Sequence, residues 1–469
     1  MDKIAIVGCG FAGTMTAVHL IKKAKFPFEL VMIGDRDSFN KGIAYNPYSK
    51  KQLLNVPAAR MSAFQDKPDH FLNWISRQEP YSGIDKELVA NAYHPRHLYG
   101  RYLNEIWRDI ILSPESIKVR ITIIGSLVDN LDISGNNIVL TLENRETITA
   151  RYCILATGNF MPGNPDIPNT QFFNNPNYFR NPWQIDAVKN HDNQLPVMIL
   201  GNGLTMADTI LGLLENGFSN KIYTLSPHGF TTLPHLHHGL GYTAIREELL
   251  SRQDLAGLVR IVHKHIRVAK ELGYSAEPII DSIRPQTQQL WKNMIPREKR
   301  MFMARLRHFW DSARHRIPMH IYDFLRQLRD SGQLTQYAGR LIDISSGQNG
   351  TPTVIFSEAG QKTTKELQVS AVINCTGPST DPMKADNNYL KNCLVKGIVV
   401  QDDLKLGILA DPVSFEVINS RHERHENIFA LGSLLKGVLW ESTAVKELRE
   451  QAEMVAGGLV SMMEGQSGS

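Results

Sequence analysis

The stretch Lys3-Ile4-Ala5-Ile6-Val7-Gly8-Cys9-Gly10-Phe11-Ala12-Gly13 decides how this chain begins to fold. Its apolar run 3–7 predicts a short buried strand, and the segment 11–24 after the glycines predicts a helix. A second apolar run, 28–33, predicts another strand. A strand, a tight turn, a helix and a strand in this order favour a parallel sheet.

The glycine spacing in this turn predicts a dinucleotide site. In the pattern Gly8-x-Gly10-x-x-Gly13, the first glycine permits the tight turn and the second lets the backbone approach a pyrophosphate. The third lets the helix pack closely on the strand, and the helix start at Phe11 and Ala12 faces the phosphates with its positive end. The motif therefore predicts nucleotide binding near the N-terminus.

An acidic residue about 20 positions after such a motif holds the ribose hydroxyls. The second predicted strand ends in Met32-Ile33-Gly34-Asp35, which makes Asp35 the candidate. Gly34 nevertheless occupies the position where the acid is first expected.

The opening pattern returns in the middle of the chain. The apolar strand 197–200 leads into Gly201-x-Gly203-Leu204-Thr205-Met206, with Asp208 shortly after. The third glycine is missing, so Met206 or Ala207 must space the helix from the strand. Such a repeat predicts two nucleotide-binding units.

The next predicted strand ends in Ser226-Pro227-His228-Gly229, without an arginine to recognise a 2′-phosphate. A preference for NADPH over NADH is therefore not supported at this place, although His228 or Arg246 remain candidates.

Two further strand ends resemble each other. Ala156-Thr157-Gly158 and Cys375-Thr376-Gly377 each follow an apolar run. Two glycine turns, each with an x-Thr-Gly strand end, form the layout of flavoproteins with two dinucleotide-binding domains, one for FAD and one for NAD(P)H. We assign the first set to FAD and the second to NAD(P): Gly8, Gly10, Phe11, Ala12, Gly13, Asp35, Thr157 and Gly158, then Gly201, Gly203, Leu204, Thr205, Asp208, His228, Thr376 and Gly377.

The expected fold is α/β with two Rossmann-like domains and a helical insertion. The NAD(P) domain, 186–377, interrupts an FAD domain made of 1–185 and 378–469. Residues 240–330 are expected to be mostly helical, and 117–155 to form a small antiparallel meander.

Composition bounds the function classes. At roughly 150 residues per domain, a chain of this length corresponds to about three domains. With 42% hydrophobic and 21% charged residues, wholesale disorder, collagen repeats and a disulfide scaffold are excluded. The net charge of +4 does not call for nucleic acid or a membrane.

The basic residues concentrate in 292–329, where ten Lys and Arg face three Asp and Glu. A solvated helix face is the plain interpretation, and recognition of an anionic substrate or cofactor by Arg314 or Arg316 is the alternative. Nucleic acid is not expected because no aromatic stacking surface accompanies the charge.

The four cysteines form no C-x-x-C pair, which argues against a disulfide reductase and favours a reduced, cytoplasmic setting. No signal peptide or membrane-spanning segment is expected. The histidine run 235–238 lacks a metal-ligand pattern, so no metal is expected there.

The chain resembles the bacterial FAD/NAD(P)-binding oxidoreductases, distant relatives of the lysine and ornithine N-hydroxylases and the amino-acid N-monooxygenases. The stretches that carry this resemblance cover nearly the whole length: 42–45 (GIAY), 54–64 (LNVPAARMSAF), 95–96 (PR), 99–102 (YGRY), 181–183 (NPW), 203–208 (GLTMAD), 309–311 (FWD), 314–316 (RHR), 430–432 (ALG) and 440–445 (WESTAV).

The resemblance implies an FAD-dependent, NAD(P)H-using oxidoreductase and favours a monooxygenase. The nicotinamide would pass hydride to flavin N5, oxygen would add to the reduced flavin, and the hydroperoxide would hydroxylate a small nucleophile such as an amine. Two alternatives remain: a reductase that passes electrons to a quinone or protein acceptor, and a non-enzymatic or nucleic-acid-associated flavoprotein.

Site residues beyond the glycine turns are less defined. Asn55 and Arg60 either line the flavin site or brace a loop. A helix start near Trp440 would stabilise the reduced flavin through its dipole. This segment adds Gly432, Trp440, Glu441, Thr443 and Ala444 to the FAD set, and the weak catalytic candidates are Asn55, Arg60, Arg314 and His315.

Overall fold

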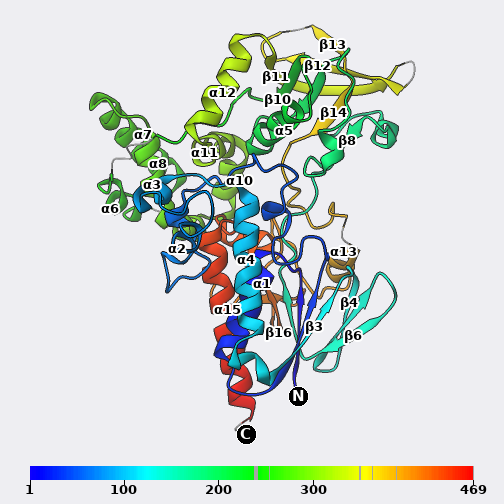
Figure 1. Ribbon diagram of the computed structural model, residues 1–469, viewed down its shortest axis with the longest axis vertical. Coiled ribbons are helices and arrows are strands. Elements are labelled where there is room, and N and C mark those ends of the chain that lie inside the picture. The colour runs from blue at the N-terminus through cyan, green and yellow to red at the C-terminus, as the bar shows by residue number, and fades with distance from the viewer. Residues whose placement is uncertain (237–240, 253, 348–349, 362, 387, 468–469) are drawn as a thin grey trace. The chain divides into compact units, whose positions relative to one another are not determined.

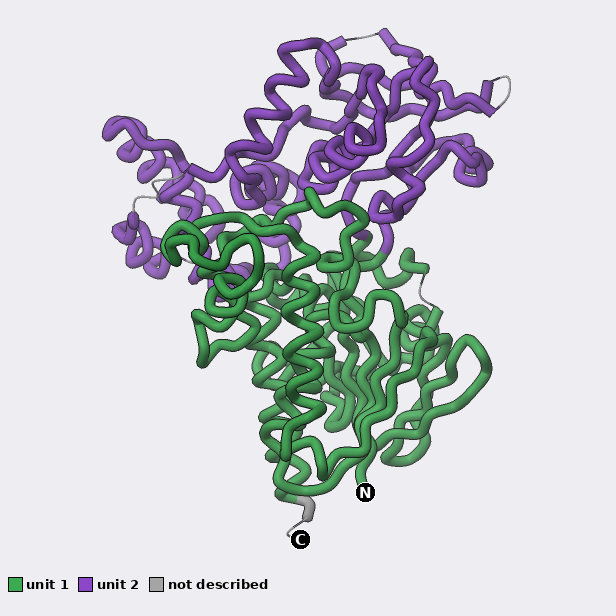
Figure 2. The backbone as a smooth tube through the Cα atoms, in the orientation of Figure 1, with its two compact units in different colours: residues 1–160, 379–469 green, residues 161–378 purple. Residues whose placement is uncertain are grey.

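The computed structural model describes residues 1–236, 241–252, 254–347, 350–361, 363–386 and 388–467. The chain divides into two compact units (Figure 2). Unit 1 is Met1–Phe160 with Ser379–Ser469, and unit 2 is Met161–Pro378. Unit 2 is thus inserted into unit 1. Its first boundary lies before the expected position 186, because β8 (Tyr178–Phe179) pairs with β14 (Ala371–Asn374) inside unit 2.

Unit 1 is built on a six-stranded sheet in the order β15-β16-β7-β1-β2-β3. All neighbours pair in parallel except β15, which lies antiparallel on β16. The strands are β1 (Lys3–Val7), β2 (Phe28–Ile33), β3 (Val119–Ile124), β7 (Tyr152–Leu155), β15 (Glu416–Ile418) and β16 (Arg424–Ala430). The strands β1 and β7 are buried almost throughout, as strands of a covered parallel sheet must be.

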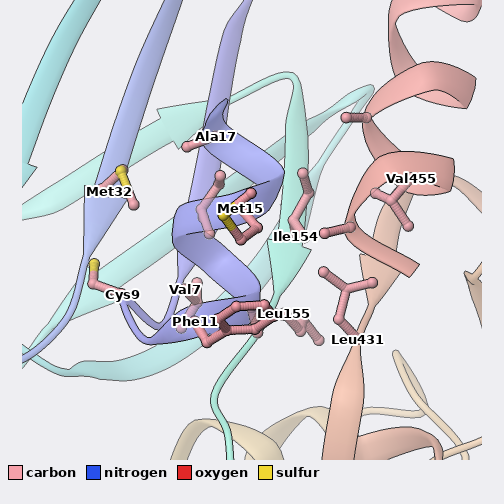
Figure 3. Close-up of a cluster of buried hydrophobic side chains, with 14 of the residues drawn as sticks. Val7, Cys9, Phe11, Met15, Ala17, Met32, Ile154, Leu155, Leu431 and Val455 are labelled. Atoms are coloured by element: carbon pink, nitrogen blue, oxygen red, sulfur yellow. The ribbon is translucent and has the colours of Figure 1, made fainter. Parts of the chain in front are cut away.

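Helix α1 (Phe11–Lys23) is the centre of the unit 1 core. It packs against α15 (Val445–Ser467) and α4 (Arg96–Ile111), and Figure 3 shows Met15 of α1 beside Ile154 of β7, with Val455 of α15 beyond Ile154. Ten of the thirteen residues of α1 are buried, and most of these are apolar, which is typical of a helix enclosed between other elements. The remaining helices of unit 1 are α2 (His70–Ile75), α3 (Lys86–Asn91), α13 (Asn388–Val395) and α14 (Lys436–Leu439).

The meander expected over 117–155 is only partly correct. An antiparallel sheet contains β4 (Val128–Ser134), β5 (Asn137–Leu142) and β6 (Thr147–Ala150). The flanking strands β3 and β7 belong instead to the parallel sheet. Alternating sequence patterns do not reveal which sheet a strand joins, because that depends on its partner.

Unit 2 contains a seven-stranded sheet in the order β13-β12-β11-β10-β9-β14-β8. The strands from β11 to β8 pair in parallel, whereas β11, β12 and β13 form an antiparallel extension. The remaining strands are β9 (Val197–Leu200), β10 (Ile222–Ser226), β11 (Leu334–Ser346), β12 (Pro352–Glu358) and β13 (Thr364–Gln368), and α5 (Leu204–Glu215) follows β9.

The helical insertion expected over 240–330 is confirmed. It lies between β10 and β11 and carries its own small core around Ile245, Leu249 and Ile279. Its helices, green to yellow-green in Figure 1, are α6 (Ile245–Leu250), α7 (Leu255–Glu271), α8 (Glu277–Ile283), α9 (Thr287–Asn293), α10 (Pro296–Arg305), α11 (Arg307–Arg314) and α12 (Met319–Asp330). Among the described residues, no helix has the length and apolar content that crossing a bilayer requires.

The two units share one strand plan. In unit 1 the parallel order runs β3-β2-β1-β7, and in unit 2 it runs β11-β10-β9-β14. In chain order, both units place helices between the second and third of these strands (β2 and β3, β10 and β11), and both form antiparallel strands before the fourth: the sheet β4-β5-β6 in unit 1, and β12 and β13 alongside β11 in unit 2. The repeat seen in the glycine turns therefore extends to the topology, and α1 and α5 occupy matching places.

Two candidate dinucleotide sites

The first glycine of each turn has the same backbone conformation. Gly8 has φ +107° and Gly201 has φ +108°, in a region that favours glycine. A Cβ atom at Gly8 would lie 2.2 Å from the carbonyl oxygen of Ala156, and one at Gly201 would lie 2.3 Å from that of Cys375. Both positions therefore require glycine, because the neighbouring strand end approaches the turn too closely for a side chain.

Both helices begin with free backbone donors. Gly10 precedes α1 with φ −80° and ψ −163°, and Gly203 precedes α5 with φ −86° and ψ −165°. Among the described residues, no side chain caps either helix, and neither first turn contains an acidic residue. The N–H groups at these starts, which include Phe11, Ala12, Leu204 and Thr205, suit a pyrophosphate.

The two turns differ in how open they are. A Cβ at Gly203 would meet nothing within 4 Å among the described residues. A Cβ at Gly10 would lie 3.4 Å from the Cα of Gly42, which belongs to the loop before the short helix η1 (Ile43–Tyr45). The turn in unit 1 is therefore covered by this loop, and no described residue covers the turn in unit 2 in the same way.

The third position of the motif is a glycine only in unit 1. A Cβ at Gly13 would lie only 2.0 Å from the carbonyl oxygen of Gly8. The matching position in unit 2 is Met206, whose side chain is buried. Helix α1 thus approaches its turn more closely than α5 does, and Met206 acts as the spacer expected from the sequence.

The x-Thr-Gly strand ends lie beside the turns. Gly158 and Gly377 both have positive φ, and a Cβ at either would meet nothing within 4 Å among the described residues. The carbonyl of Gly158 accepts a hydrogen bond from the hydroxyl of Ser433, in the short helix η8 (Gly432–Leu435) that follows β16. The Thr376 hydroxyl donates to Asn374 Oδ1 at 2.6 Å, so this threonine stabilises its own turn.

Asp35 is exposed, and its carboxylate accepts hydrogen bonds from the backbone N–H groups of Asp37 and Ser38 at 3.4 and 3.1 Å. It therefore organises the loop after β2, and its exposed position leaves it accessible to a ribose. Glycine occupies position 34 for a steric reason, because a Cβ there would lie 3.0 Å from the sulfur of Cys9.

Asn40 is a site residue that sequence reasoning missed. Its N–H donates to the carbonyl of Cys9 at 2.8 Å, and its Oδ1 accepts from the hydroxyl of Thr14 at 3.2 Å. Its φ of +64° is one that asparagine tolerates better than most residues. Asn40 thus fastens the covering loop to the first glycine turn. Only its closeness to Gly42 in the sequence marks it as a turn residue.

Asn202 is a second missed residue. It lies between the two glycines of the unit 2 turn and is only 6% exposed. Neither its Oδ1 nor its Nδ2 has a hydrogen-bond partner among the described residues. A buried amide without partners is costly, so a ligand at this turn would complete its hydrogen bonding. In unit 1 the same position is Cys9, and burial raises the pKa of its thiol to about 12.

Asn55 lies on the loop that leads to the short helix η2 (Ala58–Arg60), and Arg60 is the last residue of that helix. Asn55 Oδ1 accepts from Arg96 Nη2 at 3.5 Å, and Arg96 Nε donates to the backbone carbonyl of Leu53 at 2.8 Å. Asn55 is therefore tied to the start of α4, which supports its interpretation as a brace. Arg60 is exposed.

The segment around Trp440 contains a strained turn. Trp440 has φ +63° and ψ −69°, and the Glu441 N–H donates to the carbonyl of Leu439 at 2.8 Å, which defines a γ-turn of the rare positive-φ kind. Such strain clusters at functional sites. The expected helix start is displaced: α14 ends at Leu439, and α15 begins at Val445.

The other predicted residues of this segment lie around that turn. Gly432 has φ +70° and donates its N–H to Gln451 Oε1 at 2.9 Å. Thr443 is exposed, and the carbonyl of Ala444 accepts from the Leu448 N–H at 2.9 Å in the first turn of α15.

Arg316 does not fit the expected role in anion recognition. It is 3% exposed, and its guanidinium contacts Glu277 at 2.5 Å and Asp281 at 3.1 Å. A cation already paired inside the helical insertion is not free for a substrate. Arg314 and His315 lie at the end of α11, and His315 Nδ1 is 3.9 Å from Asp311 Oδ1.

The histidine run is only partly described. His235 Nδ1 lies 3.9 Å from Glu277 Oε1, on the outer side of the same ion-pair cluster. His237 and His238 lie outside the described residues.

These features define the class of protein. Two Rossmann-like units carry matching glycine turns, uncapped helix starts and x-Thr-Gly strand ends, which is the architecture of flavoproteins with two dinucleotide-binding domains. Residues 5–160 match the sequence model of a family described as FAD-NAD(P)-binding. Comparison with the curated proteins gives no sequence match.

Solved structures with the same fold include N-hydroxylating enzymes. The ornithine N-hydroxylase of Kutzneria sp. 744 matches with a TM-score of 0.64 and 13% identity over 99% of both chains. The ornithine hydroxylase PvdA of Pseudomonas aeruginosa matches with a TM-score of 0.63 and 13% identity over 99% of this chain and 100% of its own. The cadaverine monooxygenase DfoA of Erwinia amylovora matches with a TM-score of 0.61 and 13% identity over 98% of this chain and 94% of its own. The chain is distantly similar to these proteins in fold.

Proposed function

We propose that unit 1 holds FAD and unit 2 binds NAD(P)H. The observation that carries this assignment is the difference between the two turns. The turn at Gly10 is covered by a loop that Asn40 fastens, as suits a resident cofactor. Among the described residues, nothing covers the turn at Gly203 and the amide of Asn202 has no partner, as suits a coenzyme that binds and leaves in each cycle.

The chain would then act as an oxidoreductase, and specifically as a monooxygenase for a small amine. In this reaction NAD(P)H, a proton and O₂ convert R–NH₂ into R–NHOH, with NAD(P)⁺ and water as the other products. The flavin supplies the redox chemistry, and the chain's residues bind, orient and shield the reactants. The fold shared with ornithine and cadaverine hydroxylases supports an amine substrate.

The strained backbone at Trp440 supports a role for the α15 start in the flavin site. A positive-φ γ-turn at a tryptophan costs roughly 1–3 kcal/mol and persists only where the surroundings impose it. Trp440 is buried, and the ammonium of Lys436 lies 5.2 Å from the centre of its ring. The turn directs the chain into the N-terminus of α15, whose positive end favours a reduced, anionic flavin.

The four cysteines are free, buried thiols, which fits a reducing, cytoplasmic setting. Reduction of a quinone or protein acceptor remains the second candidate function, because the same two nucleotide sites serve it.

The test is oxygen uptake by the FAD-loaded protein with NADPH and a set of amines and amino acids. We expect one group of amines to stimulate uptake and to yield a hydroxylamine in proportion to the NADPH oxidised. Turnover that depends on a quinone and gives no hydroxylated product would assign the chain to the reductases. A protein that cannot be reconstituted with FAD would refute both.

A further inference from the structure

Four aromatic rings gather where β10 ends. His228 and Phe230 follow this strand, and His308 and Phe309 come from the first turn of α11. The ring centres of His228 and His308 are 4.1 Å apart, with planes 20° from parallel, and those of His308 and Phe309 are 4.3 Å apart. Phe230 lies 5.6 Å from His308 and is nearly parallel to it, at 9°. We call these residues the four-ring cluster.

The cluster presents apolar rings to solvent. Phe230 is 42% exposed and Phe309 is 55% exposed, although both contact other rings. Exposed phenylalanines gathered at one place indicate a binding surface more often than isolated ones do. Flat rings of this kind stack on nucleobases.

The position of the cluster relates it to the second glycine turn. In a Rossmann unit the pyrophosphate lies at the turn after the first strand, and the adenosine ribose lies at the end of the second. In unit 2 these places are Gly201–Gly203 and the end of β10 at Ser226. A Cβ at Gly229 would lie 2.8 Å from that of Ala338 on β11, so the segment with the cluster lies against the neighbouring parallel strand.

We propose that the four-ring cluster binds the adenosine 2′-phosphate end of NADP(H) and thereby selects NADPH over NADH. This inference rests on the proposed binding of NAD(P)H to unit 2. The imidazoles of His228 and His308 donate to the 2′-phosphate, and the exposed rings of Phe230 and Phe309 offer the apolar surface for the adenine.

The electrostatics of the cluster support an anionic ligand. Two stacked imidazoles at 4.1 Å repel each other when both are protonated. Burial and the neighbouring His228 lower the pKa of His308. A phosphate beside the pair offsets this repulsion and favours the charged form of His308. The paired histidines therefore replace the arginine that is missing after β10.

The test compares two ligands that differ only in the 2′-phosphate: adenosine 2′,5′-bisphosphate and adenosine 5′-monophosphate. Binding is measured by calorimetry on the FAD-saturated full chain, so that the flavin site does not take up the probe. We expect the bisphosphate to bind about tenfold or more tightly, the range of one charge-assisted hydrogen bond.

Variants separate the two parts of the proposal. His228→Phe and His308→Phe keep aromatic rings but remove the donors. We expect each to reduce the preference for the bisphosphate over the monophosphate to about threefold or less, mainly by lowering the affinity for the bisphosphate. Phe309→Ala should lower the affinity for both ligands by a similar factor, about fivefold or more, because both contain adenine. His320→Phe, at an exposed position of α12, is the matched control and should change neither affinity.

A wild-type protein that binds both ligands equally overturns the inference, and so does a preference that survives both histidine substitutions. Flavin reduction by NADPH and NADH, measured without oxygen on the same samples, separates this failure from that of the proposed function. If both coenzymes reduce the flavin equally, only the proposed selection of NADPH by the four-ring cluster is refuted. If neither coenzyme reduces the flavin, the proposed binding of NAD(P)H to unit 2 is refuted.

Discussion

At the scale of single residues, the two glycine turns show which positions of the motif are interchangeable. Gly8 and Gly201 have the same φ and the same close contact with a strand end, so glycine is required at both. Gly13 and Met206 occupy matching places but differ, because only α1 approaches its turn closely. The sequence motif was therefore sufficient to predict both turns and the need for a spacer at Met206 or Ala207, but not how closely α1 approaches its own turn.

Gly13→Ala tests this spacing. The added Cβ would lie 2.0 Å from the Gly8 carbonyl oxygen, so α1 must shift and the turn must distort. We expect the free energy of unfolding to fall by about 1–3 kcal/mol and the flavin content of the purified protein to drop. Denaturant unfolding and the flavin absorbance ratio measure the two effects.

Gly457→Ala is the control, since Gly457 lies in the middle of α15 and its Cβ would meet nothing within 4 Å among the described residues. Alanine there should raise stability by up to ~1 kcal/mol. If Gly13→Ala behaves like this control, the close approach of α1 to its turn is wrong.

The histidine pair predicts a pH dependence for coenzyme binding. The titratable groups that act on His308 are His228 after β10 and Asp311 on α11. Asp311 also pairs with Arg307 of the same helix at 3.2 Å. The pKa of His308 is lowered by burial and by His228 and raised by Asp311. Without a ligand, the lowered pKa of His308 disfavours its charged form, and a bound phosphate raises that pKa again.

Binding of the 2′-phosphate is thus coupled to proton uptake, so the affinity for adenosine 2′,5′-bisphosphate should rise as pH falls from 8 to 6. Calorimetry in two buffers of different ionisation enthalpy should detect the proton taken up. The affinity for adenosine 5′-monophosphate should change less. An identical pH profile for both ligands would exclude the histidine pair as the phosphate contact.

At the scale of elements, the sequence predicted the strands and helices next to the glycine turns well, because their apolar runs are short, strong and followed by glycine. It misplaced β3 and β7 in an antiparallel meander and the first domain boundary at 185/186. Both errors concern partners far away in the sequence. Apolar alternation identifies a strand but does not reveal its neighbour.

The helical insertion was predicted as helical, but not its internal ion pair. Arg316→Ala should lower the free energy of unfolding by about 3–5 kcal/mol, because Glu277, which is itself largely buried, would lose its partner. Arg316→Leu combined with Glu277→Gln should recover part of this loss, since no unpaired buried charge remains. Chemical unfolding followed through the cycle of single and double variants measures the coupling.

Flavin content should stay unchanged throughout that cycle, because the flavin turn lies in unit 1. If removing Arg316 costs less than about 1 kcal/mol, the pair is solvated and Arg316 returns as a candidate for anion binding.

At the scale of the whole molecule, the chain is one strand plan used twice, with the second copy inserted into the first. The repeat of Gly-x-Gly turns and x-Thr-Gly ends was visible in the sequence. Asn40, Asn202 and the four-ring cluster were not, because each depends on contacts between loops that no short motif encodes. The residues that distinguish a covered turn from an open one emerge only from the folded chain.

The central claim is that the two turns hold different nucleotides, and paired glycine variants test it most directly. Gly203→Leu directs a side chain into the open space above its turn, whereas Gly10→Leu forces a side chain against Gly42. The decisive measurement is the anaerobic reduction of bound flavin by NADPH, with dithionite as the reference reductant.

We predict that Gly203→Leu retains flavin that dithionite reduces fully but NADPH reduces at least about tenfold more slowly. Gly10→Leu should purify without flavin and still bind adenosine 2′,5′-bisphosphate, and adding Gly203→Leu to the same protein should abolish that binding, which shows that the probe occupies a folded unit 2. Normal reduction of Gly203→Leu by NADPH, or loss of flavin in both variants with coenzyme binding intact, would contradict the assignment.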